Sequence, residues 1–324
     1  MLLAQADQTA ALFRADSEDV DHQAELLRGW NQSYAQVSAG RFFGSVTEVA
    51  LGPARIFSEH TGQALMQSGL LPDDLLALGL PLSLPGPAVF CGMQDDFDAL
   101  HVFSGGSGFE FLSPGAMTMA GLVVPRAALM DLLSESEQAV LRERFGSARL
   151  ARVEADAASG ARDFVRGVLD IAETAPQVLE NRPIMDALAK GLLSNVAALI
   201  SAYAANPRET TPARRWAIVA QARDFALSRP DEPTSIAELC RETGVSRRTL
   251  QNCFQEVLGM SPAHFLRAVR MNGVRRMLRG AASVTEAAAH WGFWHFGHFA
   301  RDYAALFGEL PSQTHRRLNP RRPH

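Results

Sequence analysis

Side chains that can read DNA bases are concentrated between residues 246 and 255. Arginine can pair with guanine, and glutamine or asparagine with adenine, through two hydrogen bonds in the major groove. Side chains of this kind recur here at intervals that place them on the outward face of one predicted helix, while hydroxyl groups and free amides at its start can bind phosphate. The residues expected to contact DNA are Ser246, Arg247, Arg248, Thr249, Gln251, Asn252 and Gln255.

A second cluster of the same type begins near residue 295. Its predicted helix presents two histidines and an arginine on the outward face, together with an exposed aromatic ring. The residues expected to contact DNA in this cluster are His295, Phe296, His298 and Arg301.

The two clusters belong to a degenerate internal repeat, residues 235–259 and 283–308. In each copy a serine followed three residues later by glutamate predicts a capping box, and a glycine then ends a short helix. Residues that match between the copies lie 48 positions apart until Trp294 adds one residue, after which they lie 49 apart. One arginine-rich helix pair would be typical of a solvated bundle, but the repetition of every part favours two helix-turn-helix units.

A long helix is predicted between the copies, over residues 262–278. Ala263, Leu266, Val269, Val274, Met277 and Leu278 are its expected buried residues, and Arg267, Arg270, Arg275, Arg276 and Arg279 are expected mostly outside. A helix of 16 residues spans roughly 24 Å, which suits two reading helices about one DNA turn apart.

The distribution of charge agrees with a polyanion partner at one end. The chain has 324 residues and a net charge of −4. Residues 208–324 hold 18 Arg and 10 Asp+Glu, a balance of +8, so residues 1–207 carry −12. The three cysteines form no CxxC pair, and the mean hydropathy is −0.04. No uninterrupted apolar run reaches 18 residues and no secretory signal is evident, so a cytoplasmic protein without a membrane span is expected.

Residues 1–207 are expected to form a separate domain. Residues 1–30 look helical. Short apolar runs between Gly and Pro predict an antiparallel β structure over about 32–125, with a tight turn at 105–108. Residues 126–204 are expected to be helical, with helices near 155–172 and 183–204. The apolar stripe of the second helix is typical of core packing, with a dimer helix as the alternative, and residues 205–213 have the composition of a linker.

The C-terminal region resembles the DNA-binding domain of the AraC/XylS family of transcription regulators. The resemblance covers about residues 212–318 and rests on Gly292-Phe293, Phe299, Arg301, Tyr303, Phe307-Gly308 and Pro311. It implies an α+β two-domain protein, with seven helices at the C-terminus of which the third and sixth read DNA. It also implies an N-terminal cupin-like domain that senses a small molecule or mediates dimerisation. More weakly, Trp30-x-Gln-x-Tyr34, the Gly-x-Phe-x-Gly of residues 40–44 and the GFEF of 108–111 resemble the ethanolamine-operon regulator subgroup.

Other residues of the sequence could bind a small molecule or a metal ion. Trp30, Tyr34, Cys91, His101 and Phe109 are candidates for a ligand pocket, although core packing explains most of them better. Two sets of residues could suggest a metal site: His290, His295 and His298, and Glu59, His60, His101 and Glu110. The three histidines lack a carboxylate or cysteine ligand at a convincing spacing, and the other four residues lack a His-x-His pair. No metal or cofactor is therefore expected.

The sequence therefore predicts a non-enzymatic, sequence-specific DNA-binding regulator, expected to be a dimeric activator that recruits RNA polymerase. A metal-dependent cupin-like enzyme tethered to DNA and a non-specific architectural DNA binder are the alternatives. The sequence identifies neither the effector nor the operator.

Overall fold

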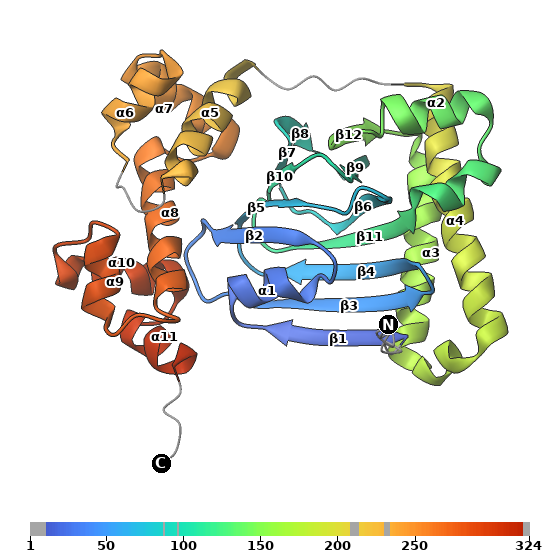
Figure 1. Ribbon diagram of the computed structural model, residues 1–324, viewed down its shortest axis with the longest axis horizontal. Coiled ribbons are helices and arrows are strands. Elements are labelled where there is room, and N and C mark those ends of the chain that lie inside the picture. Colours follow the sequence, from blue (N-terminus) through green and yellow to red (C-terminus); the bar gives the residue numbers. More distant parts are fainter. Residues whose placement is uncertain (1–10, 87, 96, 208–213, 230–233, 320–324) are drawn as a thin grey trace, which may run out of the picture.

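The computed structural model describes residues 11–86, 88–95, 97–207, 214–229 and 234–319. Figure 1 shows a β region flanked on one side by two long helices and on the other by a helical C-terminal region. The predicted combination of an antiparallel β-rich N-terminal region with an all-helical C-terminal region is thus confirmed.

Two antiparallel sheets form the β region. The larger has the order β1 (Leu12–Ser17), β3 (Gly44–Leu51), β4 (Ala54–Thr61), β11 (Met117–Pro125), β6 (Leu75–Ser83), β9 (Ala99–Ser104), β12 (Arg149–Arg152). The smaller has the order β2 (Asn31–Gln36), β5 (Leu65–Leu70), β10 (Phe109–Leu112), β7 (Ala88–Phe90), β8 (Met93–Asp95). The predicted tight turn at 105–108 joins β9 to β10.

Alternation along the strands of the larger sheet creates two cores. In β6, Leu76, Leu78 and Leu80 face the long helices, whereas Ala77 faces the smaller sheet. Because both faces of this sheet are covered, β6 and β11 are apolar almost without interruption. The core between the sheets includes a group of aromatic rings, Trp30, Phe57, Phe90, Phe103, Phe109 and Phe111.

The helices on the outer face are α3 (Ala155–Thr174) and α4 (Arg182–Ala205), close to the two predicted helices. The short elements nearby are α1 (Val20–Leu26), η1 (Arg126–Leu132), α2 (Glu135–Glu143) and η2 (Pro176–Glu180). Helix α4 is long and apolar enough to cross a membrane by length and composition, but Leu192, Val196 and Leu199 pack it onto the β region.

Two strands lie outside the predicted β segment. Residues 12–17 form an edge strand paired with β3 although the first 30 residues look helical, and only Val20–Leu26 is a helix among the described part of them. Strand β12 has four residues, too few to show a period of two. Both segments are strands because they pair with a neighbouring strand, and a local sequence pattern does not contain that information.

The described part of the C-terminal region contains seven helices, the number that the resemblance implies. They are α5 (Arg214–Ser228), α6 (Ile236–Thr243), α7 (Arg247–Leu258), α8 (Pro262–Met277), α9 (Val284–His290), α10 (Phe296–Phe307) and α11 (Pro311–Leu318). The third and sixth of these are α7 and α10. Most of the predicted linker, residues 208–213, lies outside the described residues.

Candidate DNA interface

The first helix-turn-helix unit consists of α6 and α7. The predicted capping box is present: the Ser235 amide donates to Glu238 Oε2 at 2.8 Å, and the Glu238 amide donates to Ser235 Oγ at 3.3 Å. The Ser235 hydroxyl donates to Glu238 Oε2 at 2.7 Å, and this hydrogen bond, followed by the one from the Ser235 amide, lowers the pKa of Glu238. Helix α6 ends at Gly244, whose φ of 65° is the left-handed conformation that glycine adopts at little cost.

The outward face of α7 is fully available. Helix α7 is capped by Ser246, whose Oγ accepts from the Thr249 amide at 3.1 Å, and Leu250, Cys253 and Phe254 form its buried side. All seven residues predicted to contact DNA in this unit are exposed: Ser246, Arg247, Arg248, Thr249, Gln251, Asn252 and Gln255. Within the described part of the chain, the two arginines pair with no carboxylate, so both guanidinium groups can meet bases or phosphates.

The second unit, α9 and α10, has the same build with two differences. Ser283 Oγ accepts from the Glu286 amide at 3.1 Å, but the Glu286 carboxylate accepts from Ala282 at 3.0 Å rather than from Ser283. The Glu286 side chain therefore caps the amide of Ala282, one residue before the Ser283 amide of the predicted capping box. The second difference is Trp294, the additional residue, whose side chain lies in solvent with 71% of its area exposed.

The second reading face is also exposed, at His295, Phe296, His298 and Arg301. Arg301 Nη2 lies 2.7 Å from His298 Nδ1. Because a guanidinium can only donate, Nδ1 is the acceptor, and Nε2 of a neutral His298 presents its N–H outward. Asp302 does not belong to this face, since it is half-buried and paired with Arg267 of α8.

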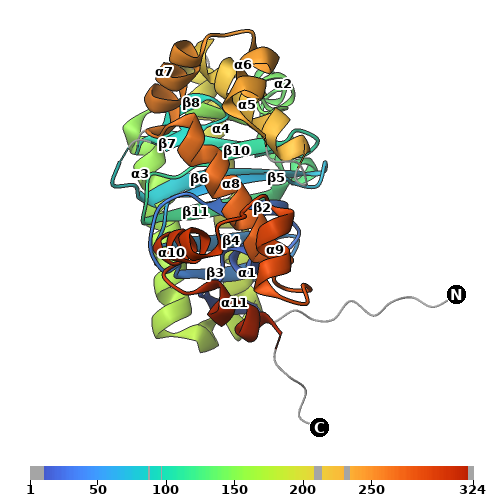
Figure 2. The ribbon, with the colours of Figure 1, turned by 90° about the vertical axis from the view of Figure 1, so that its left-hand side faces the viewer.

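Helix α8 separates the two units and positions them. With the helical region facing the viewer in Figure 2, α7 and α10 lie on the same side of α8, one near each end. Sixteen residues of helix span about 24 Å, so the reading helices are spaced for neighbouring turns of one duplex.

The burial of α8 differs from the predicted pattern. Ala263 is exposed and Arg275, expected outside, is only 2% exposed. Helix α8 packs against the cores of both units and, on a third side, against strand β2. A helix with three packed sides has no single apolar stripe to reveal them.

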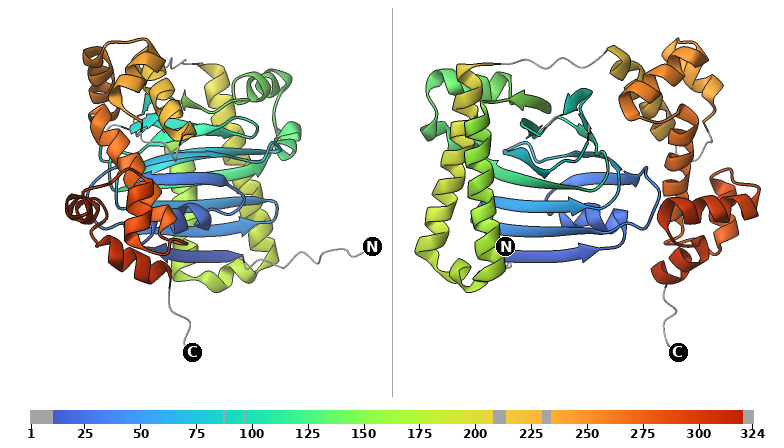
Figure 3. Two further views of the ribbon diagram at one scale, coloured as in Figure 1. Left: turned by 60° about the vertical axis from the view of Figure 1, so that its left-hand side comes forward. Right: turned by 180° about the vertical axis from the view of Figure 1, so that it is seen from behind.

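Polar groups of α8 hold the second unit on the β region. Asn272 is buried on the edge strand β2, where its Oδ1 accepts from the Gln36 amide at 3.0 Å and its Nδ2 donates to the Gln36 carbonyl at 2.9 Å. It therefore satisfies backbone groups that an edge strand leaves open. Nearby, the Gly40 amide donates to the Leu306 carbonyl at 3.0 Å. Figure 3 shows the helical region against this end of the sheets.

Four charged residues, Asp19, Arg275, Glu309 and Arg317, form an interdomain cluster beside Asn272. Arg275 Nη2 lies 2.9 Å from Asp19 Oδ2, and its Nη1 lies 3.1 Å from Glu309 Oε1. Arg317 contacts the same two carboxylates at 3.4 and 2.8 Å. Burial by itself raises the pKa of Asp19, but Arg275, the His22 amide and Arg317 outweigh burial and lower it. Asp19 therefore stays ionised in the docked arrangement.

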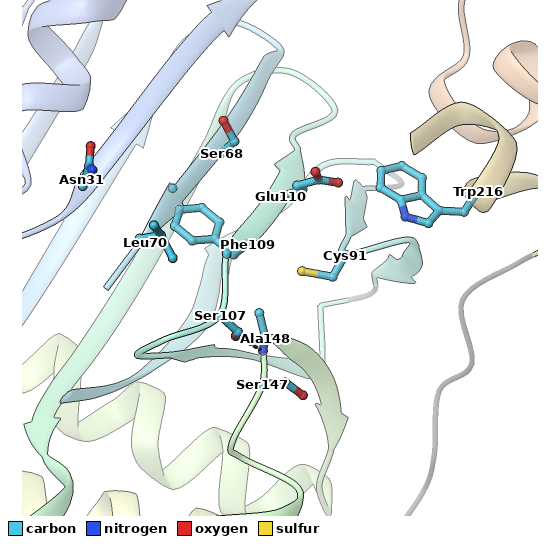
Figure 4. A pocket seen from close by; sticks show the side chains of 12 residues that line it. Asn31, Ser68, Leu70, Cys91, Ser107, Phe109, Glu110, Ser147, Ala148 and Trp216 are labelled. Carbon is cyan, nitrogen blue, oxygen red and sulfur yellow. Dashed lines mark hydrogen bonds between the residues drawn. The ribbon is translucent and has the colours of Figure 1, made fainter. Parts of the chain in front are cut away.

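The first unit is attached separately, through α5. Arg223 is buried and pairs with Glu110 of β10 and with Asp224, and its guanidinium lies over the Trp216 ring. Figure 4 shows Trp216 and Glu110 on one rim of a surface pocket of about 510 Å³. Cys91 also lies here, and burial raises the pKa of its thiol to about 12, so it is not a reactive thiolate.

The predicted ligand residues divide between two places. Trp30, Tyr34, His101 and Phe109 line a cavity between the sheets, whereas Cys91 lies in the surface pocket of Figure 4, which Phe109 also touches. The cavity volume is about 20 Å³, enough for about one water molecule. In its present form the cavity therefore holds no larger ligand unless the lining side chains move.

The cavity contains a buried carboxyl group that sequence reasoning considered only as a metal ligand. Both Glu59 carboxylate oxygens accept from the Tyr34 hydroxyl at 3.1 Å, and Oε1 also accepts from Gln23 Nε2 at 3.0 Å. Burial raises the pKa of Glu59 to about 7, although both hydrogen bonds lower it in part. Burial, followed by the Glu59 charge, also raises the pKa of Tyr34 well above its usual value.

The residues considered for metal sites are not brought together. Among the described residues, no three His, Cys, Asp or Glu side chains are grouped closely enough to hold a metal ion. His60 instead contacts Thr118 at 3.1 Å, and Glu110 pairs with Arg223.

Comparison with known proteins identifies the helical region. Residues 239–317 match a family model described as a helix-turn-helix domain. The chain is 37% identical over 147 residues to "Probable thc operon regulatory protein" of Rhodococcus erythropolis, which is 43% of each protein. It is 36% identical over 84 residues to "XylDLEGF operon transcriptional activator" of Pseudomonas putida, 25% of this chain and 26% of that protein. The matches therefore span less than half of these relatives.

Among solved structures, the AraC-like transcriptional activator CuxR aligns with 86% of this chain and 99% of its own, at 15% identity and a TM-score of 0.45. A probable AraC family transcriptional regulator from Rhodopseudomonas palustris CGA009 aligns with 32% of this chain and 99% of its own, at 36% identity and a TM-score of 0.31. The match to the family model, together with the two exposed units described above, identifies residues 239–317 as a helix-turn-helix domain.

Proposed function

We propose that this chain is a sequence-specific transcription regulator of the AraC/XylS type that binds one stretch of double-stranded DNA with α7 and α10. One observation carries the proposal: both predicted reading faces are exposed, and the two helices that carry them lie on the same side of α8. Similarity to proteins named as operon regulators agrees with it. Residues 1–207 would be the regulatory domain and 208–324 the DNA-binding domain.

The remaining properties are proposals of the same kind. A small-molecule effector would enter the cavity lined by Trp30, Tyr34, His101 and Phe109, with the lining side chains moving apart. A homodimer would form through α4, whose outer face exposes the small residues Ser194 and Ala198 one turn apart. The protein would act in the cytoplasm, without enzymatic activity, as an activator that recruits RNA polymerase. The resemblance to the ethanolamine-operon subgroup stays a prediction, since no comparison supports it.

The first experiment is selection of binding sites from random DNA by the full-length chain. Sequence-specific binding predicts an enriched motif, and a dimer predicts two related half-sites within it. An architectural binder predicts no enrichment and little preference over random DNA at physiological salt.

The second step uses variants of the first unit on the selected site. Arg247→Ala and Gln251→Ala are each expected to weaken binding by about 1–3 kcal/mol and to relax preference at one base position. Arg142→Ala, an exposed arginine of α2, serves as the charge-matched control and should leave binding unchanged. If Arg247→Ala and Gln251→Ala instead weaken binding to all sequences equally, both residues contact only phosphate.

A further inference from the structure

The second unit carries an aromatic patch that packing does not require. Trp294 is 71% exposed and Phe296, two residues on, is 42% exposed, so Trp294 is the most exposed large apolar side chain among the described residues. Trp291, in the same turn, behaves differently, because its ring packs against Gly273 of α8. An exposed apolar patch rimmed by polar groups indicates a contact surface.

The position of this patch suggests what it contacts. Trp294 follows the buried corner residue Phe293, and Phe296 opens α10, so both lie at the N-terminal end of the reading helix. That end is the part of a recognition helix that approaches the base edges. His295, His298 and Arg301 of the same unit are also exposed, and their polar groups can donate to bases or phosphates.

We propose that Trp294 and Phe296 contact the 5-methyl groups of thymines in the major groove. The inference rests on the proposed function and deepens it. The thymine methyl is the only apolar group that the base edges present in the major groove, and an aromatic ring has little to gain from a phosphate oxygen. The two units then select bases differently: α7 by hydrogen bonds to guanine and adenine, and α10 in large part by apolar contact with thymine.

The repeat supports this division of roles. At the matching place the first unit continues directly from Val245 to its cap Ser246 and to Arg247, whereas the second unit inserts Trp294 before its cap His295. The inserted residue is therefore additional to the parts that the helix-turn-helix needs for folding. Its exposure also means that Trp294→Ala should leave the fold intact, which circular dichroism would verify.

The test replaces single thymines of the selected site by uracil, which removes the methyl group and keeps every hydrogen bond of the base. In the half contacted by the second unit, one or two replacements are expected to weaken binding of the unaltered protein about fourfold each. Trp294→Ala or Phe296→Ala should weaken binding to the thymine site by a similar factor and abolish the response to uracil at one of those positions. Gln251→Ala, in the first unit, should retain the full response.

The outcomes separate this inference from the function on which it rests. If selection yields no motif, the proposed function fails. If a motif is found but uracil is tolerated everywhere under the second unit, while Trp294→Ala still weakens binding, methyl contact is refuted and the ring contacts another part of the DNA. If neither the uracil replacements nor Trp294→Ala alters DNA binding, and Trp294→Ala lowers only transcription, the patch contacts a protein and the inference is again refuted.

Discussion

Removing the charge of Arg275 should release the second reading unit from the β region. The Arg275 guanidinium is 2% exposed and is the central member of the interdomain cluster, between Asp19 of the β region and Glu309 at the end of α10. Arg275→Met keeps much of the apolar stem and removes every polar contact. Asp19 then remains nearly buried, and among the described residues Arg317 is the ion-pair partner that it keeps.

The size of the effect follows from these contacts. Breaking a buried ion pair by removing one partner costs about 3–5 kcal/mol, because the other charge stays desolvated. Arg317 is 39% exposed and already reaches Asp19 at 3.4 Å, so it compensates in part, and we take the lower value. About 3 kcal/mol corresponds to a roughly 100-fold larger undocked population.

Two backbone amides measure docking directly. The Gln36 amide donates to Asn272 and the Gly40 amide donates to the Leu306 carbonyl, so both acceptors belong to the helical region. Hydrogen–deuterium exchange at these two amides should therefore accelerate by roughly 100-fold in Arg275→Met.

Two further variants make the measurement specific. Asn is also a good helix cap, so Asp19→Asn keeps the α1 cap and removes the buried charge that Arg275→Met leaves behind. The double variant Asp19→Asn/Arg275→Met should therefore recover most of the protection from exchange. Arg276→Met is the matched control: Arg276 is 41% exposed and 3.7 Å from Asp21, so exchange should barely change. Equal protection in Arg275→Met and Arg276→Met would refute the reasoning.

Three other variants test the cavity and the domain contact. Because burial raises the pKa of Glu59 from 4.5 to about 7, protonation of Glu59 stabilises the folded chain. This stabilisation is fully present below pH 4.5 and is lost as the pH rises through 7. The unfolding free energy of Glu59→Gln minus that of the unaltered chain, from urea titrations, should thus rise by about 3 kcal/mol between pH 4 and pH 8, and a constant difference would contradict the burial argument. Gly308 and Gly259 both have left-handed φ, but a Cβ at Gly308 would lie 2.6 Å from the Arg41 backbone and one at Gly259 would meet nothing within 4 Å. Gly259→Ala should cost about 1 kcal/mol of stability alone, whereas Gly308→Ala should also accelerate exchange at Gly40; equal exchange in both would disprove the contact.

The helix-turn-helix units could be predicted because their signals are local. Serine caps, glycine turns and buried residues spaced by four all lie within 25 residues, and the repeat provided an internal comparison. Accordingly the positions of α7 and α10, and the exposure of every predicted contact residue, agree with the sequence. The inserted Trp294 was visible in the same comparison, although only the structure shows that it is exposed.

What could not be predicted depends on partners that are distant in sequence. Asn272 contacts Gln36 across 236 positions and Arg275 contacts Asp19 across 256, so neither pair leaves a local pattern. An arginine in a basic helix looks like a surface residue unless its carboxylates are known. The role of Glu59 was hidden for the same reason, since Gln23 and Tyr34 come from other elements.

Strand β2 joins the cavity to the DNA-binding region over a very short distance. Tyr34 donates its hydroxyl hydrogen bond to Glu59 inside the β region, and Gln36, two residues further along the same strand, holds Asn272 of α8. A ligand large enough to fill the cavity has to displace side chains such as Tyr34, because the present volume admits about one water molecule. Packed strands do not deform continuously, so such a displacement acts on the strand that also carries the docking contact. Under the proposed function, an effector would therefore alter how α8 is held on the β region, and with it the spacing of α7 and α10.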